Sequence, residues 1–391
     1  MAVTINHQTN DISATSGSLT IDGAAVGGGG GGGGTIFDAV SGASQTLDVG
    51  SADFFYAGIL TADTTVSFSN VPTEAKWTYT FEGGVVSAYS IDTAFYDNIF
   101  FSIASQEVGP TGIFFKPDGT KMYVLGNVSD SVHQYSLSTA WDISTASYDS
   151  VSFSVSNQEG SAQDLFFKSD GTKMYIVGFF NKTIYQYTLS SAWDVSSASY
   201  DSVGFSVNSQ DSTPFGFFIK PDGTKMYVMG ATNDAVFQYS LSSAWDMSTA
   251  SYDTVSFSIS SQELNPQTLF FKSDGTKFYV LGYGNDTIFQ YSLSTAWDMT
   301  TASYDGIAFG VLSQDASPSG LFFKSDGTKF YVLGPSADAV FQYSSVVSTS
   351  VTLPASVQNP PKKPYGPNRV TYDFFTSDGG TNVYLIGEGV L

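Results

Sequence analysis

A 52-residue repeat fills the middle of this chain and limits what the chain can fold into. The segment F-x-K-[PS]-D-G-T-K occurs five times, with no insertion or deletion between copies. Its aspartates lie 52 residues apart, at Asp118, Asp170, Asp222, Asp274 and Asp326. A fixed period of this length is typical of architectures in which one supersecondary unit is copied, such as solenoids and propellers.

Each repeat predicts four antiparallel strands. In the second copy, an apolar run is followed by the hairpin signal Asp170-Gly171. Two alternating segments come next, then a loop through Trp193, then a last alternating segment. The four expected strands are 164–168, 173–177, 183–189 and 203–207. Four such strands in about 50 residues indicate one propeller blade.

The two ends of the array predict how the ring closes. Residues 88–107 align with residues 140–159, 52 positions later, with Tyr89 in place of tryptophan. The array therefore starts with an extra fourth strand, around 99–103, while the last copy stops after its third strand at 342–345. This displaced strand would complete the last blade and remove exposed strand edges. We predict an all-β protein with a closed five-bladed propeller at residues 87–345.

The sequences on either side of the propeller predict further β-structure. Residues 1–34 are polar and end in eight glycines, Gly27–Gly34. This run is interpreted either as a flexible linker or as ordered poly-glycine packed against its own copies. Residues 35–86 and 346–391 both contain alternating strands with turns. Termini that lie close together make insertion of a domain easy, so these two segments are expected to form one split domain.

Particular motifs in these flanks resemble those of tail-fibre-like virion proteins of marine bacteriophages. They are T-L-D-x₆-F from Thr46, L-T-x-x-T-T-x-S-F-S-N-x-P from Leu60, L-P-A-S-V from Leu353 and F-F-T-S-D-G-G-T from Phe374. The resemblance implies a small β-sandwich-like fibre domain with the propeller inserted in a loop. It also implies that residues 1–34 attach to other virion proteins and that residues 1–86 and 346–391 form a homotrimer.

The repeat itself resembles the YVTN- or NHL-like propeller units of bacteria, through P-D-G-T-K-x-Y-V. The resemblance concerns a turn and the strand that follows it, and it implies the propeller fold.

Charge and composition exclude several partners. The net charge is -21 and Arg369 is the single arginine, so binding to nucleic acid or to an anionic membrane is not expected. The chain has no cysteine, which excludes disulfides and thiolate metal sites. Residues 1–17 have no apolar signal-peptide core, and no stretch approaches the ~20 apolar residues of a membrane span. We expect folding in the host cytoplasm and location in the virion, although an ordinary cytoplasmic protein fits the same features.

No motif for catalysis was found, so the sequence predicts a protein that is not an enzyme. The two histidines are His7 and His133, and neither lies in a Ser-His-Asp context. His133 stands where the other copies carry Tyr185, Phe237, Phe289 and Phe341, which predicts a packed structural side chain.

One acidic residue recurs in every repeat, in the loop that leads into the innermost strand. These residues are Glu107, Glu159, Asp211, Glu263 and Asp315. Catalytic sites break symmetry, so a residue present in every blade is expected to serve the blade by accepting N–H bonds of its loop. A calcium ion held by these oxygens and contacts to sugar remain alternatives; no other cofactor is expected.

The tryptophans of the repeats, Trp141, Trp193, Trp245 and Trp297, are interpreted as packing anchors, with a stacking platform for carbohydrate as the alternative.

The copies differ most in two sets of loops, those between the second and third strands and those between one blade and the next. In a propeller these loops lie on the same face, which makes that face the candidate binding surface. Phe179, Phe180 and Tyr283 are its expected aromatic anchors. Asn181, Asn233 and Asn285 are the expected hydrogen-bonding residues. Neutral drift of exposed loops is the alternative explanation.

Three functions follow as expectations. The first is a phage fibre or adhesin whose propeller presents a binding face to a host-surface glycan or receptor. The second is a structural head-fibre or decoration protein of the virion, without a dedicated ligand. The third is a bacterial carbohydrate-binding propeller lectin.

Overall fold

The computed structural model describes residues 3–6, 11–14, 19–21, 24–26, 37–39, 44–52, 54–59, 64–82, 88–92, 94–345, 351–358, 369–378 and 380–390. The chain divides into two compact units. One consists of Met1–Val86 with Val346–Leu391, and the other of Ser87–Ser345. Gly27–Gly34 and His7 lie outside the described residues.

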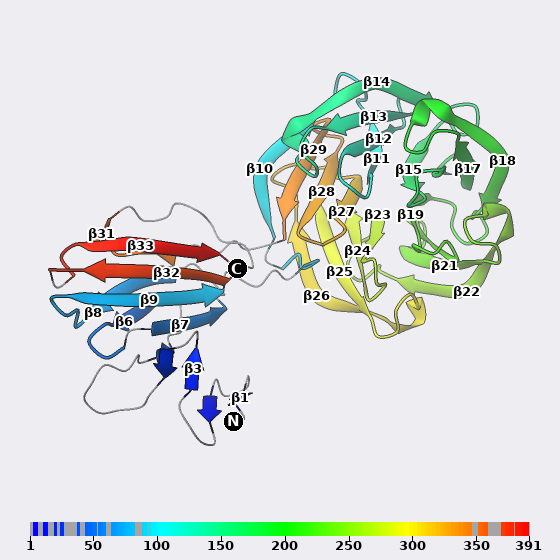
Figure 1. Cartoon of the computed structure of the whole chain (residues 1–391). Helices are drawn as coiled ribbons and strands as arrows, with labels where there is room; N and C mark the ends of the chain where they lie inside the picture. Colours follow the sequence, from blue (N-terminus) through cyan, green and yellow to red (C-terminus); the bar gives the residue numbers. More distant parts are fainter. Residues whose placement is uncertain are drawn as a thin grey trace. The chain divides into compact units, whose positions relative to one another are not determined.

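The unit Ser87–Ser345 is a propeller of five four-stranded antiparallel sheets around one axis (Figure 1). We call the strands of each blade A to D, from the axis outwards. Blade 1 has β11 (Pro110–Phe115), β12 (Lys121–Gly126), β13 (Ser131–Leu137) and β14 (Ala146–Ser154). Blade 2 has β15 (Ala162–Phe167), β16 (Lys173–Gly178), β17 (Thr183–Leu189) and β18 (Ala198–Ser206). Blade 3 has β19 (Pro214–Ile219), β20 (Lys225–Gly230), β21 (Ala235–Leu241) and β22 (Ala250–Ser258). Blade 4 has β23 (Pro266–Phe271), β24 (Lys277–Gly282), β25 (Thr287–Leu293) and β26 (Ala302–Gly310).

Blade 5 joins the two ends of the array, which confirms the predicted closure. Its strands A to C are β27 (Gly320–Phe323), β28 (Lys329–Gly334) and β29 (Ala339–Ser344), and its strand D is β10 (Phe95–Ser102). Strand β10 pairs antiparallel with β29, from Phe95↔Ser344 to Ser102↔Ala339. Lys329 Nζ lies 2.8 Å from Asp97 Oδ2 across this junction.

Strand D is longer than the sequence predicts. In blade 2 it runs over Ala198–Ser206 instead of 203–207, because Asp201 and Ser202 form a bulge opposite Gln186 and Tyr187, and pairing continues beyond it to Ala198. The other three predicted strands of this blade are found within two residues of their expected bounds.

The repeated tryptophan covers the D-G turn of its own blade and holds the neighbouring blade. Gly171 has a φ of +74°, and a Cβ there would lie 2.4 Å from the indole of Trp193. The backbone N–H of Trp193 donates to Gly171 O at 3.1 Å, and the other three tryptophans make the equivalent bond at 3.0 to 3.1 Å. The carbonyl of Trp193 accepts a hydrogen bond from Tyr123 Oη of blade 1, at 2.7 Å. Trp193 itself has a φ of +66°. Such a backbone is strained in a residue with a large side chain, and these contacts stabilise it. The four repeated tryptophans are therefore packing anchors. In blade 5, Tyr89 covers Gly327 in the same way.

The second unit contains two sheets that share one core. A three-stranded sheet has the order β30 (Val351–Thr352), β8 (Thr64–Ser69), β6 (Ser44–Asp48). A six-stranded sheet has the order β31 (Val357–Gln358), β33 (Val383–Val390), β32 (Arg369–Thr376), β9 (Ala75–Glu82), β7 (Phe54–Ile59), β5 (Phe37–Ala39). Leu47 and Val66 from the smaller sheet pack with Trp77 and Phe374 from the larger one.

Strands that precede the propeller in the sequence pair in this unit with strands that follow it. Strands β9 and β32 pair along their whole length, from Arg369↔Glu82 to Thr376↔Ala75. Two separate hairpins precede them: β1 (Val3–Asn6) with β2 (Asp11–Ala14), and β3 (Leu19–Ile21) with β4 (Ala24–Val26). Within the described residues, the structure contains no helix with the length and apolar character that a membrane span requires.

Candidate binding site

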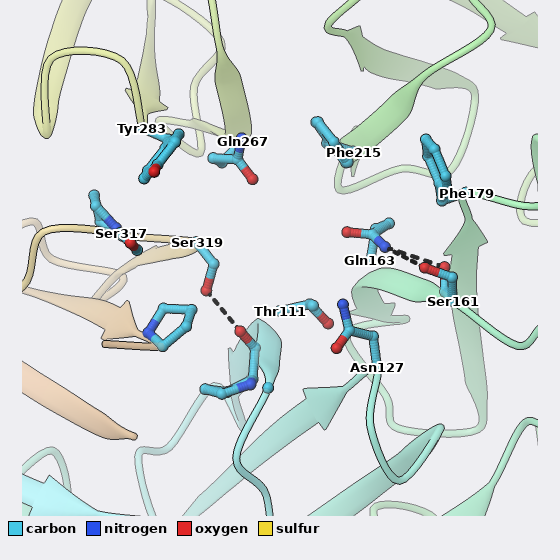
Figure 2. Close-up of a pocket in the computed structure, with 14 residues that line it drawn as sticks. Thr111, Asn127, Ser161, Gln163, Phe179, Phe215, Gln267, Tyr283, Ser317 and Ser319 are labelled. Carbon is cyan, nitrogen blue, oxygen red and sulfur yellow. Dashed lines mark hydrogen bonds between the residues drawn. The ribbon is translucent and has the colours of Figure 1, made fainter. Parts of the chain in front are cut away.

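A pocket of about 430 Å³ lies on the propeller face that carries the B–C loops and the loops between blades (Figure 2). The D–A loop connects strand D of one blade to strand A of the next. The lining residues are Gly109, Pro110, Thr111, Asn127, Ser161, Gln163, Phe179, Phe215, Gln267, Tyr283, Ser317, Pro318, Ser319 and Pro335. They come from all five blades, so the pocket surrounds the propeller axis.

Two repeat positions supply most of this lining. One lies at the start of strand A and is occupied by Thr111, Gln163, Phe215, Gln267 and Ser319. The other is the first residue of the B–C loop, occupied in four blades of the pocket by Asn127, Phe179, Tyr283 and Pro335. The backbone repeats around the ring, whereas these side chains differ from blade to blade. A pocket made of equivalent positions is therefore asymmetric in its chemistry.

The walls of the pocket combine aromatic rings with amide groups. Phe179 and Phe215 lie nearly parallel, with ring centroids 6.0 Å apart and an angle of 16° between planes. Figure 2 shows Tyr283 on the other side of the pocket, and this side chain is 50% exposed. The wall thus offers flat apolar surface next to polar groups.

The two glutamines are held by hydrogen bonds that orient their amides. Gln163 Nε2 donates to Ser161 Oγ at 2.9 Å and to Ser161 O at 3.2 Å. Gln267 Nε2 donates to Asn265 O at 3.3 Å. Both amide oxygens are directed towards the open centre of the pocket (Figure 2). They are preorganised acceptors for a ligand hydroxyl or amide.

A buried carboxylate fills the axis beneath the pocket. Asp164 Oδ1 accepts from Leu165 N at 2.8 Å, and Oδ2 accepts from Thr268 Oγ1 at 3.1 Å and from Phe217 N at 3.3 Å. Burial raises the pKa of the Asp164 carboxyl to about 7, although these hydrogen bonds act in the opposite direction.

Glycine occupies the position equivalent to Asp164 in three of the other blades, at Gly112, Gly216 and Gly320. A Cβ at Gly112 would lie 2.9 Å from Asp164 Oδ1, so the carboxylate occupies the space of that side chain.

Five phenylalanines close the axis one layer further down. Each ring meets two neighbours, with centroid distances of 5.1 to 5.5 Å and interplanar angles near 70°. The residues are Phe114, Phe166, Phe218, Phe270 and Phe322. Edge-to-face contacts of this kind are favourable for aromatic pairs. Because the ring of side chains is closed, the pocket opens on one face of the propeller.

The structure places two of the six predicted ligand-binding residues in the pocket, Phe179 and Tyr283. Phe180 lies outside the lining with its side chain 59% exposed. The asparagine side chains are used within the protein, because Nδ2 donates to the preceding D–A loop at 2.9 to 3.0 Å. In this way Asn181 bonds to Gln158 O, Asn233 to Gln210 O and Asn285 to Gln262 O. None of the three asparagines lines the pocket, and their role in ligand binding stays a prediction.

Four further pocket residues were not among those predicted from the sequence: Asn127, Gln163, Phe215 and Gln267. The signal was present at residue 163 and its equivalents, where the five copies carry Thr, Gln, Phe, Gln and Ser. It was missed because comparing copies marks a position as variable without showing that it faces the axis.

The repeated acids fasten the loops of their own blades. Glu159 is 1% exposed; its Oε1 accepts from Ser161 N and Phe180 N at 3.0 Å, and its Oε2 accepts from Asn181 N at 3.1 Å. Glu107, Asp211, Glu263 and Asp315 make similar bonds. In the part of the chain that the structure describes, no group of three or more acidic, histidine or cysteine side chains is placed to hold a metal ion.

His133 has a hydroxyl neighbour, Ser129, that was not predicted from the sequence. Ser129 Oγ lies 3.1 Å from His133 Nε2 and donates a short hydrogen bond to Glu107 Oε2. Burial lowers the pKa of His133 and favours the neutral ring. Glu107 Oε2 bonds to the serine and lies 3.9 Å from His133 Nε2, the ring nitrogen that also faces the serine, whereas in a Ser-His-Asp triad the carboxylate bonds to the other ring nitrogen.

No family model matches this chain, and no curated protein matches it. Among solved structures, a functionally unknown protein from Desulfotomaculum acetoxidans has 11% identity and a TM-score of 0.37, over 71% of this chain and 69% of that one. A putative 6-phosphogluconolactonase from Bacteroides uniformis has 10% identity and a TM-score of 0.38, over 72% of each chain. Another from Bacteroides fragilis has 11% identity and a TM-score of 0.37, over 72% of this chain and 71% of that one.

The expectation that the protein is not an enzyme is withdrawn, since two of these similar structures are described as putative 6-phosphogluconolactonases. The likeness concerns the fold, and it transfers no activity, substrate or catalytic residue to this chain. The fold and the pocket define a five-bladed β-propeller with a pocket at its axis.

Proposed function

We propose that this protein is a bacteriophage fibre or adhesin whose propeller presents the axial pocket and its surrounding loops to the host cell surface. The observation that carries this proposal is the concentration of differing residues in one pocket. Equivalent positions around a repeated scaffold carry Asn127, Phe179, Tyr283 and Pro335, and they converge on the axis. Function is often placed on loops that a rigid scaffold presents.

The contrast with the scaffold positions argues against simple drift. Aspartate recurs in each D-G turn, and a carboxylate recurs at Glu159 and its four equivalents, since each of these side chains bonds to nearby backbone. Neutral drift would produce different residues at exposed positions over the whole of this face. Here two half-buried aromatic residues of the wall, Phe179 and Phe215, differ from their equivalents, and they do so in adjacent blades.

The virion part of the proposal rests on the flanking sequences. The segments that resemble phage fibre motifs include Thr46 to Asp48 and Phe374 to Thr376. Both segments supply strands of the same unit, where Leu47 and Phe374 share a core. This arrangement supports a fibre module that carries the propeller as an insertion. In such a protein, residues 1–34 would contact other virion proteins.

Binding of the full-length protein to intact cells of a panel of marine bacteria tests the adhesin. The test variant is Phe179→Ala with Tyr283→Ala, which removes aromatic surface from the pocket. The matched control is Phe100→Ala, which removes a ring that is 60% exposed on the outer strand β10, away from the pocket. Saturable binding that the test variant loses and the control keeps would support the proposal.

The opposite result has a defined meaning as well. Binding of wild type and both variants to the same extent would remove the pocket from host recognition. If the folded protein binds no cell but is present in purified particles, the head-fibre or decoration protein becomes the better explanation. The uniform scaffold of the five blades favours that second candidate.

A further inference from the structure

We infer that the axial pocket binds the terminal residue of a neutral glycan end-on, with one site for each propeller. This inference rests on the proposed host-binding function and deepens it by stating the ligand chemistry and the number of sites. It differs from a lectin with one sugar site in every blade.

The lining of the pocket is uncharged. Its hydrogen-bonding side chains are amides and hydroxyls, among them Asn127, Gln163 and Gln267, and its residues include no Asp, Glu, Lys, Arg or His. Amides can both donate to and accept from sugar hydroxyls. The net charge of -21 disfavours anionic sugars, since a negative field repels them.

The arrangement of the walls matches a ligand with one apolar face and a hydroxylated edge. Phe179 and Phe215 offer two nearly parallel rings, 6.0 Å between centroids. The amide oxygens of Gln163 and Gln267 face the same space (Figure 2). A pyranose ring has C–H groups on its face and hydroxyls around its edge, and aromatic side chains are common partners for such mixed ligands.

The floor of the pocket determines the direction of entry. Asp164 and Thr268 are joined across the axis, and the five phenylalanines lie beneath them. A glycan chain therefore cannot pass through the ring, and its end must enter from the loop face. The pocket has a volume of about 430 Å³. This volume is at the lower end of the range for small-molecule sites, which suits a terminal residue.

The number of sites follows from the fivefold ring. All five blades contribute to a single axial pocket, and the contributing side chains differ. The four repeated tryptophans, Trp193 and its equivalents, could have provided a stacking surface for sugar in several blades. They pack against the D-G turns instead. One ligand for each chain is therefore expected.

Isothermal titration of the full-length protein tests this inference. The probes are methyl glycosides of neutral hexoses and N-acetylhexosamines, with a uronic acid and an amino sugar as charged comparisons. We expect one neutral sugar bound for each chain, with affinity reduced about tenfold by Gln163→Ala or Gln267→Ala. Asn208→Ala, an exposed amide outside the pocket, should leave the affinity unchanged.

Several outcomes would overturn the inference. They are preferential binding of a charged sugar, several equal sites for each chain, unchanged affinity in the glutamine variants, and no binding of any neutral probe at millimolar concentration. Near-ultraviolet circular dichroism confirms that each variant is folded. If Phe179→Ala with Tyr283→Ala abolishes cell binding while no neutral sugar binds, the host-binding function stands and the neutral-glycan inference fails.

Discussion

Asp164 of blade 2 and Thr268 of blade 4 are joined by a hydrogen bond across the propeller axis, with 3.1 Å between Oδ2 and Oγ1. These residues are 104 positions apart in the chain. The bond places a carboxylate where three other blades have glycine, and it closes the bottom of the candidate binding pocket.

The raised pKa of Asp164 predicts a pH-dependent stability. In the unfolded chain this carboxyl ionises near pH 4, whereas in the folded protein burial raises its pKa to about 7. The folded state therefore holds its proton more tightly, and stability from this group is lost as pH rises from about 4 to about 7. The free energy of unfolding of the wild type should fall by a few kcal/mol between pH 4 and pH 8 through this group, since each pKa unit corresponds to about 1.4 kcal/mol, and Asp164→Asn should remove that part of the pH dependence. Urea unfolding of both proteins at pH 4 and pH 8 measures the two slopes, and a variant with the pH dependence of the wild type would contradict the prediction.

The carboxylate of Glu159 holds two loops together. Glu159→Ala would leave three partly buried backbone N–H donors, those of Ser161, Phe180 and Asn181, without their acceptor. Loss of stability by roughly 2 to 4 kcal/mol is expected. Hydrogen exchange should show faster exchange at Phe180 and Asn181 and little change in the other blades. Glu159→Gln keeps one acceptor oxygen and should be less damaging; equal damage from both variants would argue for a charge effect instead.

The last residue of strand B in blade 2, Gly178, leaves the space that the Glu159 carboxylate occupies. A Cβ on Gly178 would lie 2.0 Å from Glu159 Oε2, so Gly178→Ala forces the buried acid to move. We expect a loss of several kcal/mol in unfolding free energy, in the range for disrupted buried networks. Gly310→Ala is the matched control, because nothing lies within 4 Å of its added Cβ. Calorimetric melting of the two variants compares them, and equal melting temperatures would contradict the close contact.

The ring of phenylalanines should contribute strongly to stability. Phe218 is 7% exposed and contacts Phe166 and Phe270, with centroids 5.2 and 5.5 Å away. Phe218→Ala leaves a cavity at the axis, and a cost of about 3 to 5 kcal/mol is expected. Phe218→Leu should cost less, because it fills part of the space. Denaturant titration checks both, and an unaffected midpoint in the alanine variant would show that the ring does not support the fold.

Assembly is predicted from the proposed virion function. Multi-angle light scattering of the full-length protein should give three times the mass of one chain. Truncation to residues 87–345 should give a monomer, because the expected trimer contacts lie in residues 1–86 and 346–391. A monomeric full-length protein with native circular dichroism would refute the trimer.

The sequence supported the prediction of the blades because their signals are local. Each Asp-Gly pair forms a turn in which the glycine has a positive φ, as at Gly171. The early start of strand D was missed, since a β-bulge opposite Gln186 and Tyr187 depends on pairing between strands and has no strong local signal.

Local comparison of repeats was less successful for the site. It identified Phe179 and Tyr283 but not Gln163 or Phe215 as pocket residues, and it did not show that the Asn181 amide bonds to Gln158 O. The contact of Ser129 with His133 was also missed, because a separation of four residues across a turn does not show which way either side chain points.

The sequence by itself determined the number of blades, the turn at each repeat and the closure of the ring by β10, because these depend on repeated local patterns and on where the copies start and stop. Only the tertiary structure decided that residues 163 and 267 share a pocket, and that Asp164 bonds to Thr268 beneath it. Ring closure brings the innermost strands of all five blades to one axis, so side chains over 100 residues apart compete for the same space, and that competition cannot be read from any single repeat.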